Sequence, residues 1–415
     1  MARIYSLTLS LFLLLTFFNL QEAEAQTARY ELLPSPDLWY NDVDGIRVGL
    51  RLKGQVPGTF EDGPHRLDAG LWLGLWFPDL PVSYYLSLTE PIQPWSEYGS
   101  EANIQFISSI RTGYHNHGIG FNKRWQQGFD ERRFREMGIY NSFEKRFDLE
   151  YTPFPLLWSE NDKLLTSVKF ELQNDHELGW YNLRTDASLQ YLDEVYAFTT
   201  ITATQRVELH EHWAIRLRAF TGLATSGTAP EYLFSRGIKP AAQWMDNGST
   251  RAKGTIPNRL MQSGNVQVAG GANLRGYTNQ DIHSFKTCQN EAVDNGCIES
   301  PFLFNGILAF NAELDYWNPV AVAFNKIPYI SEFLRFRSYF FFDTGTSLEI
   351  TENDLSGSFS NAGAGFSLSL NIPDYHGKPR GIVLRYEIPF WLSDSGGEDS
   401  FKLRHLIGYG AVISF

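Results

Sequence analysis

The chain has 415 residues and a formal net charge of −12, and 15% of its residues are aromatic. Nucleic acid is a poor partner for so acidic a chain, because binding phosphates needs a basic surface. A soluble protein of this length would usually divide into about two or three domains. A membrane β-barrel better explains many aromatic residues at a slightly polar mean hydropathy of −0.27, because alternate strand residues face lipid and a wet lumen.

The N-terminus has the pattern of a secretory signal peptide, residues 1–25. Arg3 supplies a positive charge, an apolar stretch runs from Leu7 to Leu20, and Ala23-Glu24-Ala25 offers small residues at the positions that a signal peptidase reads. A single transmembrane anchor is the alternative, but this stretch is shorter than the ~20 residues that a spanning helix needs. We expect removal after Ala25, which leaves a mature chain of 390 residues (415 − 25).

We expect residues 26–42 to form a short periplasmic segment. Apolar and polar residues then alternate repeatedly along residues 43–415, which we expect to form an outer-membrane barrel. Such a period of two predicts antiparallel strands. The first strand is expected from Asp44 to Leu52. Further apolar positions are Leu67, Ala69, Leu71, Leu73, Leu75 and Phe77; Tyr181, Leu183, Thr185, Ala187, Leu189 and Tyr191; Leu308, Phe310, Ala312, Leu314 and Tyr316; and Ile382, Leu384, Tyr386 and Ile388. The runs are about nine to thirteen residues long, which suits a tilted strand that crosses a bilayer.

The predicted fold class is all-β, a 16-stranded antiparallel transmembrane β-barrel. About fifteen alternating runs can be recognised. Because bacterial barrels favour even strand numbers, we assign a sixteenth strand to the region near residues 126–142, where the alternation is not clear. A soluble β-sandwich, the alternative, would use shorter strands. The last strand is expected from Leu403 to Phe415, where Gly410, Ile413 and the terminal Phe415 form a candidate C-terminal insertion signal.

One connection is exceptionally long: residues 224–301 show no convincing strand pattern. A loop of this length in a compact fold indicates a function. It contains both cysteines of the chain, Cys288 and Cys297. In an exported protein this spacing favours a local disulfide, because a metal site would need more ligands than these cysteines and the nearby His283.

Gly270-Gly271-Ala272-Asn273-Leu274-Arg275-Gly276-Tyr277 lies inside this loop. Here the chain resembles the outer-membrane assembly and secretion superfamily of BamA, TamA and the two-partner-secretion transporters, barrels of the bacterial surface antigen type. The resemblance implies sixteen strands and a sixth extracellular loop that folds into the lumen between strands 11 and 12. We call residues 224–301 loop six. Leu274-Arg275-Gly276-Tyr277 resembles the V-R-G-F/Y tip of that loop in the family.

Other motifs follow in the family's order. Tyr40 to Arg47 resembles the opening barrel strand, and a strand that ends Asp315-Tyr316-Trp317-Asn318-Pro319 resembles a strand after loop six. Phe341-Phe342-Asp343-Thr344-Gly345 resembles the F-x-D-x-G signature, and Gly363-Ala364-Gly365-Phe366 follows it. This ordered set extends over most of the mature chain.

A lumen position for Arg275 would be costly unless the guanidinium were paired. Alternation puts Asp315 and Asp343 on the lumen side of their strands, and a guanidinium can bond a carboxylate bidentately. We therefore expect Arg275 to bind Asp343, with Asp315 nearby. Gly276 would permit a tight backbone, and Tyr277 would pack against the wall. The alternative is a set of unrelated loop and strand charges.

One departure from the family concerns the N-terminus. Family members usually carry periplasmic POTRA domains that receive clients, whereas about sixteen residues separate Gln26 from the first expected strand here. We expect a chain that lacks POTRA domains, so the resemblance implies the barrel without implying how clients are received.

Candidate catalytic groups are few. Tyr114-His115-Asn116-His117-Gly118 invites comparison with outer-membrane phospholipases, which use a His, a Ser and an Asn on the outer wall. A nucleophile must lie within hydrogen-bond reach of its base, but Ser108 and Ser109 lie earlier on the same expected strand. His210-Glu211-His212 offers too few metal ligands. We predict a protein that is not an enzyme and has no cofactor or metal.

The leading functional hypothesis is a barrel that assists insertion or translocation of polypeptide, or of lipid, at the outer membrane of a Gram-negative bacterium. It would open between Asp44–Leu52, where Gly45 and Gly49 thin the strand, and Leu403–Phe415. A structural or passive channel barrel and an outer-membrane lipase are the alternatives. Expected partners are outer-membrane lipid and lipopolysaccharide and either a separate periplasmic receptor or a client polypeptide, with no nucleic acid.

Overall fold

The computed structural model describes residues 30–57, 59, 61, 63–127, 130–245, 252–291, 301–324, 326–327, 333–348, 357–373 and 379–412. The predicted signal peptide lies outside these residues. Within them, seventeen strands form one sheet and the helices are short, which confirms the prediction of an all-β fold. No helix in the described part of the chain has the length and apolar character to cross a membrane.

The strands before loop six are β1 Glu31–Asn41, β2 Gly45–Gln55, β3 Arg66–Gly74, β4 Val82–Pro91, β5 Ser100–Arg111, β6 Tyr114–Gln127, β7 Asp130–Arg146, β8 Lys163–His176, β9 Gly179–Gln190, β10 Tyr196–His210 and β11 Trp213–Ala224. The later strands are β12 Val266–Val268, β13 Gly306–Asp315, β14 Leu334–Ser347, β15 Ser358–Pro373, β16 Pro379–Leu392 and β17 Leu406–Val412. The α-helices are α2 Asn258–Met261, α3 Thr278–Glu291 and α4 Pro319–Phe324.

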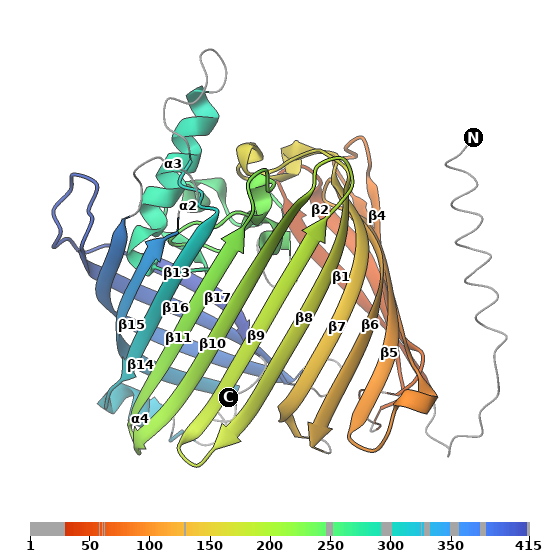
Figure 1. Ribbon diagram of the computed structural model, residues 1–415, viewed down its shortest axis with the longest axis horizontal. Helices are drawn as coiled ribbons and strands as arrows, with labels where there is room; N and C mark the ends of the chain where they lie inside the picture. Colours follow the sequence, from red (N-terminus) through yellow and green to blue (C-terminus); the bar gives the residue numbers. More distant parts are fainter. Residues whose placement is uncertain are drawn as a thin grey trace.

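Each strand pairs antiparallel with the next one along the chain, except that β11 pairs with β13. The short strand β12 lies outside this order and pairs in parallel with β17. The sheet curls into a barrel-like wall, with β14 and β15 behind the green strands of Figure 1. The ladders of the described residues run from β1 round to β17 and include none between those two strands.

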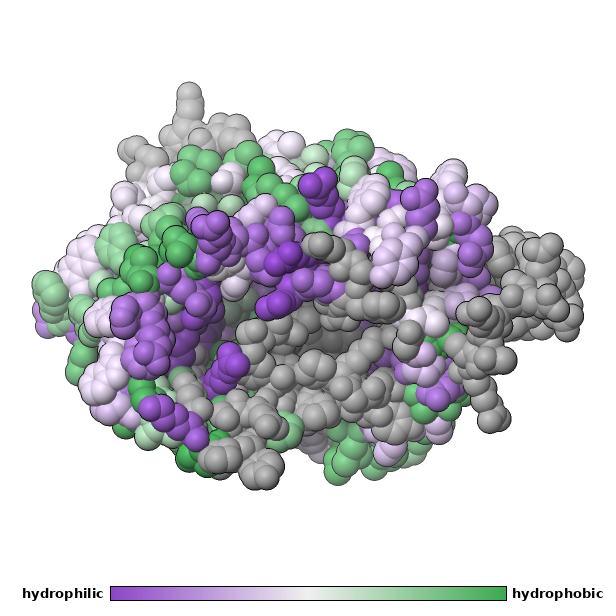
Figure 2. Space-filling view, turned by 90° about the horizontal axis from the view of Figure 1, so that it is seen from below, coloured by the Kyte–Doolittle hydropathy of each residue, from purple (hydrophilic) through white to green (hydrophobic). Residues whose placement is uncertain are grey.

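The two faces of this sheet differ as the alternation predicts. On β3, Leu71 is 58% exposed while the neighbouring Trp72 is 6% exposed. On β13, Leu308 and Phe310 are exposed, whereas Asn311 is buried. Figure 2, seen from below, shows hydrophilic side chains toward the inner part of this face and hydrophobic ones mainly toward the periphery. The sheet therefore has an apolar outer face and a polar inner face.

The N-terminal part of the wall differs from the prediction. Residues 26–42 were expected to precede the barrel, but Glu31–Asn41 forms β1 and pairs with β2 along its whole length. Pro34 and Pro36 make this segment look unlike a strand in the sequence, because a proline has no N–H to donate to a β-ladder. Both can be accommodated where the proline nitrogen points away from the neighbouring strand, as it does on an edge.

Two further strand assignments also differ from the prediction. The expected first strand, Asp44–Leu52, corresponds to β2, which has a neighbour on each side and is not an edge. The last strand begins at Leu406 and not at Leu403. The strand that was assigned to the region near residues 126–142 lies there as β7, Asp130–Arg146.

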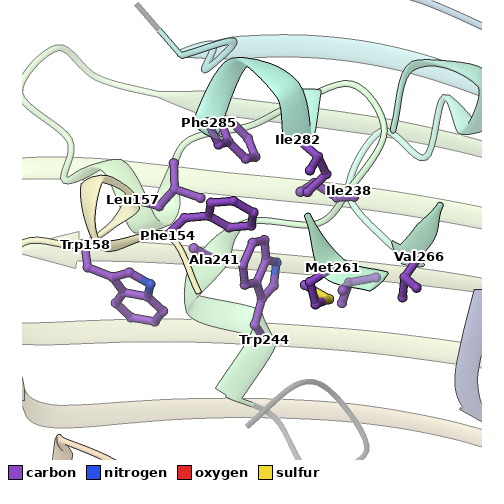
Figure 3. Close-up of a cluster of buried hydrophobic side chains, with 11 residues drawn as sticks. Phe154, Leu157, Trp158, Ile238, Ala241, Trp244, Met261, Val266, Ile282 and Phe285 are labelled. Carbon is purple, nitrogen blue, oxygen red and sulfur yellow. The ribbon is translucent and has the colours of Figure 1, made fainter. Parts of the chain in front are cut away.

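Loop six contains more regular structure than its sequence indicates. Besides α2, β12 and α3 it holds the short helices η5 Pro230–Tyr232, η6 Ala241–Met245 and η7 Arg275–Tyr277. Its apolar side chains pack with Phe154, Leu157 and Trp158 of the β7–β8 connection, as Figure 3 shows. Their spacing has no single period because they come from several short segments, so sequence patterning could not identify this core.

Candidate functional site

The candidate site is the inner wall of β13 to β16 with the tip of loop six. A tight turn leads into it: Gly270, Gly271 and Asn273 all have positive φ, a region that glycine and asparagine enter most readily. The Leu274 N–H then donates to the Arg236 carbonyl at 2.8 Å. This turn directs the Arg275 side chain toward the wall.

Arg275 binds Asp343 of β14 in a two-pronged arrangement. Its Nη2 donates to Oδ1 at 2.7 Å and its Nε donates to Oδ2 at 2.9 Å. The backbone N–H of Arg275 also donates to Oδ2, at 3.2 Å. The guanidinium lies 3.9 Å from the centroid of the Phe341 ring. A planar fork matches a carboxylate in this way, whereas a lysine would offer a single point charge.

Arg275 also binds two carboxylates that were not predicted from the sequence. Its Nη1 donates to Glu313 Oε1 of β13 and to Glu387 Oε1 of β16, each at 2.8 Å. Alternation alone already puts both residues on the lumen side. The sequence does not show the register, which is how far each strand is shifted along its neighbours.

Asp315, by contrast, is not a ligand of Arg275. It lies 3.4 Å from Arg206 and 2.8 Å from Arg337. The ladder places Asn311 opposite Asp343 and Asp315 opposite Tyr339. Asp315 is therefore four residues along its strand from the level of Asp343, about 13 Å at the usual rise. Asp315 was expected near Arg275, but the cations that it pairs with are Arg206 and Arg337.

The charge balance around Arg275 favours the cation. Its side chain is fully buried, and burial by itself lowers the pKa of a guanidinium. Asp343, Glu387 and Glu313 outweigh that effect and raise the pKa of Arg275 well above its ordinary value. The buried charge is therefore compensated by several carboxylates, which is the condition for a stable buried ion.

The neighbours of Arg275 in the motif fit small spaces in the wall. A Cβ on Gly276 would lie 2.9 Å from Asn361 Cβ and 3.2 Å from Leu392 Cδ1. The Tyr277 hydroxyl donates to the Ser360 carbonyl at 3.1 Å, and its ring meets Phe359 edge to face. Leu274 is fully buried and lies over Gly345. The tip of loop six is therefore held against the wall by close packing as well as by the ion pairs of Arg275.

A second buried ion pair lies within loop six. Arg236 Nη2 is 2.8 Å from Asp281 Oδ1 of α3, and both side chains are at most 3% exposed. The Gly237 N–H donates to the same carboxylate at 2.7 Å. Burial raises the pKa of Asp281, and the Arg236 charge opposes that rise. This pair holds α3 against the segment before the motif.

The other predicted site residues are placed as follows. Cys288 is buried on α3 and disulfide-bonded, and the sequence has one other cysteine, Cys297, which lies outside the described residues. Gly410 lies in β17, while Ile413 and Phe415 lie outside the described residues. No group of three His, Cys, Asp or Glu residues that could hold a metal occurs in the described part of the chain.

A serine and a histidine do meet on the outer face, contrary to the expected separation. Ser108 Oγ lies 2.9 Å from His117 Nδ1, because the β5–β6 ladder sets these residues opposite each other. They share their face with the exposed Ile104 and Ile119. The Tyr84 hydroxyl lies 3.0 Å from the same serine. No carboxylate or amide bonded to the His117 ring is present among the described contacts, so the third member of a triad is missing there.

Comparison with known proteins gives structural neighbours only. No family model and no curated protein matches the sequence. BamA from Haemophilus ducreyi lacking POTRA domains 1–3 is 12% identical, with 92% of this chain and 71% of that chain covered and a TM-score of 0.46. CdiB from Acinetobacter baumannii is 11% identical, with 94% and 60% covered and a TM-score of 0.39. Pseudomonas aeruginosa OprD is 9% identical, with 94% and 97% covered and a TM-score of 0.35. Similarity this low leaves the function to be argued from the chain's own geometry.

Proposed function

We propose that this chain is a non-enzymatic, sixteen-stranded β-barrel in the outer membrane of a Gram-negative bacterium, where it assists insertion or translocation of polypeptide or lipid. It would act by opening between β1 and β17. The observation that carries this proposal is the buried anchor of loop six, in which Arg275 binds Asp343, Glu313 and Glu387. A barrel that holds a loop inside its lumen in this way can control an opening in its own wall.

The outer face supports a membrane location. Leu71, Ile119 and Leu308 are 58%, 56% and 45% exposed on different strands. A soluble monomer rarely exposes a continuous apolar band of this kind, because the band would drive association. Lipid removes that problem by covering it. Strands such as β8, with 14 residues, also exceed the roughly 9–11 residues needed to span the hydrocarbon.

The first and last strands of the sheet, β1 and β17, support the proposal of a seam that can open. β12 lies inside the lumen with loop six, so the wall itself consists of β1 to β11 and β13 to β17, and closure would bring β1 beside β17. Pro34 and Pro36 have no N–H groups, so β1 has fewer donors to offer a partner strand. A seam with missing donors costs less to open than a regular ladder.

A structural barrel without insertase activity is the second candidate. The same anchor favours it, because a loop held by three carboxylates is poorly suited to frequent movement. Both candidates require the chain to be a membrane barrel, and they differ only in whether the seam opens in use.

Reconstitution in lipid vesicles tests the proposal. The purified protein should show β-rich circular dichroism and heat-modifiable gel migration. A urea-denatured small outer-membrane barrel, added as client, should fold faster into these vesicles than into vesicles that hold an unrelated barrel of equal mass. An unchanged folding rate would favour the structural candidate, and recovery of the protein as a water-soluble periplasmic species would reject the barrel itself.

A further inference from the structure

The outer face of β6 and β7 carries cations near one end of the barrel. Side chains alternate along a strand, so Lys123 and Trp125 share the outer face of β6 with the exposed Ile119. By the same alternation, Arg135 shares the outer face of β7 with the exposed Met137. β6 ends and β7 begins at the bottom of Figure 1, away from α3 of loop six. These cations therefore lie on the apolar face of the wall and not on the lumen side.

Arg135 has no counter-charge on this face. Its cross-strand neighbours are Trp125 of β6 and Leu172 of β8, and neither is charged. In the described part of the chain, the Arg135 guanidinium makes neither a hydrogen bond nor an ion pair, and the side chain is exposed. An arginine on the lipid-facing side of a barrel is costly when it is not compensated. A group outside the protein must therefore supply the negative charge.

Lys123 lies beside Arg135 and has one donor left. Its Nζ donates to the Trp95 carbonyl at 2.6 Å and to Ser100 Oγ at 2.8 Å, whereas an ammonium group has three donors. Because Arg135 is opposite Trp125 in the ladder, Lys123 is its diagonal neighbour, at a Cβ separation of about 7–8 Å. Two long basic side chains at this separation can hold one phosphate group between them.

The apolar run on the outer face of β6 is short. From Lys123 toward loop six, the outward residues are Phe121 and Ile119, and then the polar His117. Lys123 and His117 are six positions apart (123 − 117), which is about 20 Å along a strand and about 14 Å across the membrane at a ~45° tilt. The apolar band of an outer-membrane barrel is ~25 Å tall. At least one end of this run would lie in hydrocarbon unless lipid headgroups approach the wall there.

Aromatic rings lie beside the two cations. Trp125 and Trp95 are both exposed, and Lys123 Nζ is 5.4 Å from the centroid of the Trp125 ring. The Trp95 ring meets Phe121 edge to face, with ring centroids 5.8 Å apart. Tryptophan is enriched where lipid headgroups meet the hydrocarbon, because its ring is apolar and its N–H is polar. The level of Lys123 and Arg135 therefore corresponds to the headgroup interface.

We propose that Lys123 and Arg135 bind the phosphate of an anionic phospholipid, whose acyl chain lies along Phe121 and Met137. The lipid belongs to the leaflet away from loop six, which is the periplasmic one under the proposed function. The inference rests on the membrane location in that function and not on client assembly. A zwitterionic headgroup carries its own ammonium group, which two cations without counter-charge would repel.

The charge of the whole chain makes this preference specific to the site. The chain has a formal net charge of −12, so its general electrostatic effect is to repel anionic lipid. A preference for anionic lipid at β6 and β7 must therefore come from the local cations.

Photocrosslinking in phosphatidylcholine vesicles tests the site. The probes are trace amounts of phosphatidylglycerol or phosphatidylethanolamine with a photoreactive group in the acyl chain, and peptide mass spectrometry locates the label. Phosphatidylglycerol should label the peptides that carry Phe121 and Met137 about 25-fold more than phosphatidylethanolamine does, because each of two basic residues contributes roughly fivefold near a membrane surface. The peptide that carries Phe340, which is exposed on β14, should be labelled equally by both lipids.

Two matched double variants test the residues. Lys123→Gln/Arg135→Gln should lower labelling by phosphatidylglycerol to the level of phosphatidylethanolamine. Arg132→Gln/Arg133→Gln removes the same charge from the same hairpin, but these arginines lie 3.7 and 3.5 Å from Asp130, so labelling should change less than twofold. Both variants should keep heat-modifiable migration, which shows that they fold.

Three results would overturn the lipid site. Equal labelling by the two lipids in the wild type would show that the cations do not select an anionic headgroup. Equal losses in the two double variants would show an effect of general charge. Loss of labelling in excess inorganic phosphate would show an anion site that does not need a lipid.

The outcome for the proposed function can be read separately. A folded barrel without lipid preference would reject this inference alone. Selective labelling in a barrel that does not speed client folding would retain the lipid site and reject the assembly role. A water-soluble periplasmic protein would reject both.

Discussion

Leu274 lies directly over Gly345, so closely that a Cβ on this glycine would be 3.1 Å from Leu274 Cδ1 and 2.7 Å from the Leu308 carbonyl oxygen. The glycine of the F-x-D-x-G motif therefore leaves room for the first residue of the loop-six tip. This contact and the adjacent ion pair of Arg275 join loop and wall at one place.

Gly345→Val should displace the loop tip, since overpacking of a tight site costs roughly 1–3 kcal/mol. We expect faster protease cleavage within loop six in folded protein, while heat-modifiable migration is retained. Phe342→Ala is the matched control, because its side chain is on the same strand and exposed on the outer face. Equal protection of loop six in wild type and Gly345→Val would contradict the packing argument.

Arg275→Ala should release loop six more completely. Removing one partner of a buried ion pair typically costs ~3–5 kcal/mol, and three carboxylates would lose their shared cation here. Asp343→Ala should give the same loop phenotype, and the double variant should be less than additive because the pair is coupled. Hydrogen exchange of loop-six amides measures this.

Arg275→Lys serves as the control for charge in the same experiment. It retains the charge but not the fork, so it should restore protection only in part. Full protection in Arg275→Lys, or strictly additive losses in Arg275→Ala/Asp343→Ala, would argue against the bidentate anchor.

Cys288→Ser/Cys297→Ser should loosen loop six locally. A disulfide that closes a loop of about ten residues stabilises by on the order of 2–3 kcal/mol in the chain-entropy view. Cys288 lies on α3 beyond Phe285, which packs in the loop core, so exchange should increase first at that end of α3. The Arg275 anchor and the thermal stability of the barrel should change little. Two free thiols in protein purified without reductant would exclude the bridge.

Ser108→Ala should leave phospholipid hydrolysis at the background of protein-free vesicles. The contact between Ser108 and His117 has the geometry of a nucleophile and base, but a triad also needs a group that orients the histidine. Fatty-acid release from labelled phospholipid vesicles is the measurement, with His117→Ala as the companion variant. Hydrolysis by wild type that both substitutions abolish would show an enzyme.

The sequence by itself determined the all-β class, the alternation of the two faces on strands such as β3 and β13, and the position of the Arg275 motif in a long loop. These features are local, because side chains alternate along any strand whatever its neighbours are. Alternation also placed Asp343 and Glu313 on the lumen side. It could not indicate β1, since Pro34 and Pro36 interrupt the usual strand pattern.

Only the tertiary structure decided which lumen carboxylates meet Arg275. Glu313 and Glu387 bind it and Asp315 does not, because the register between strands fixes their relative heights and no local pattern records that register. The parallel pairing of Val266–Val268 with β17 could not be predicted from the sequence either. A strand of three residues gains its stability from the ladder and the core that receive it, about 140 residues away along the chain, so its own sequence carries almost no signal.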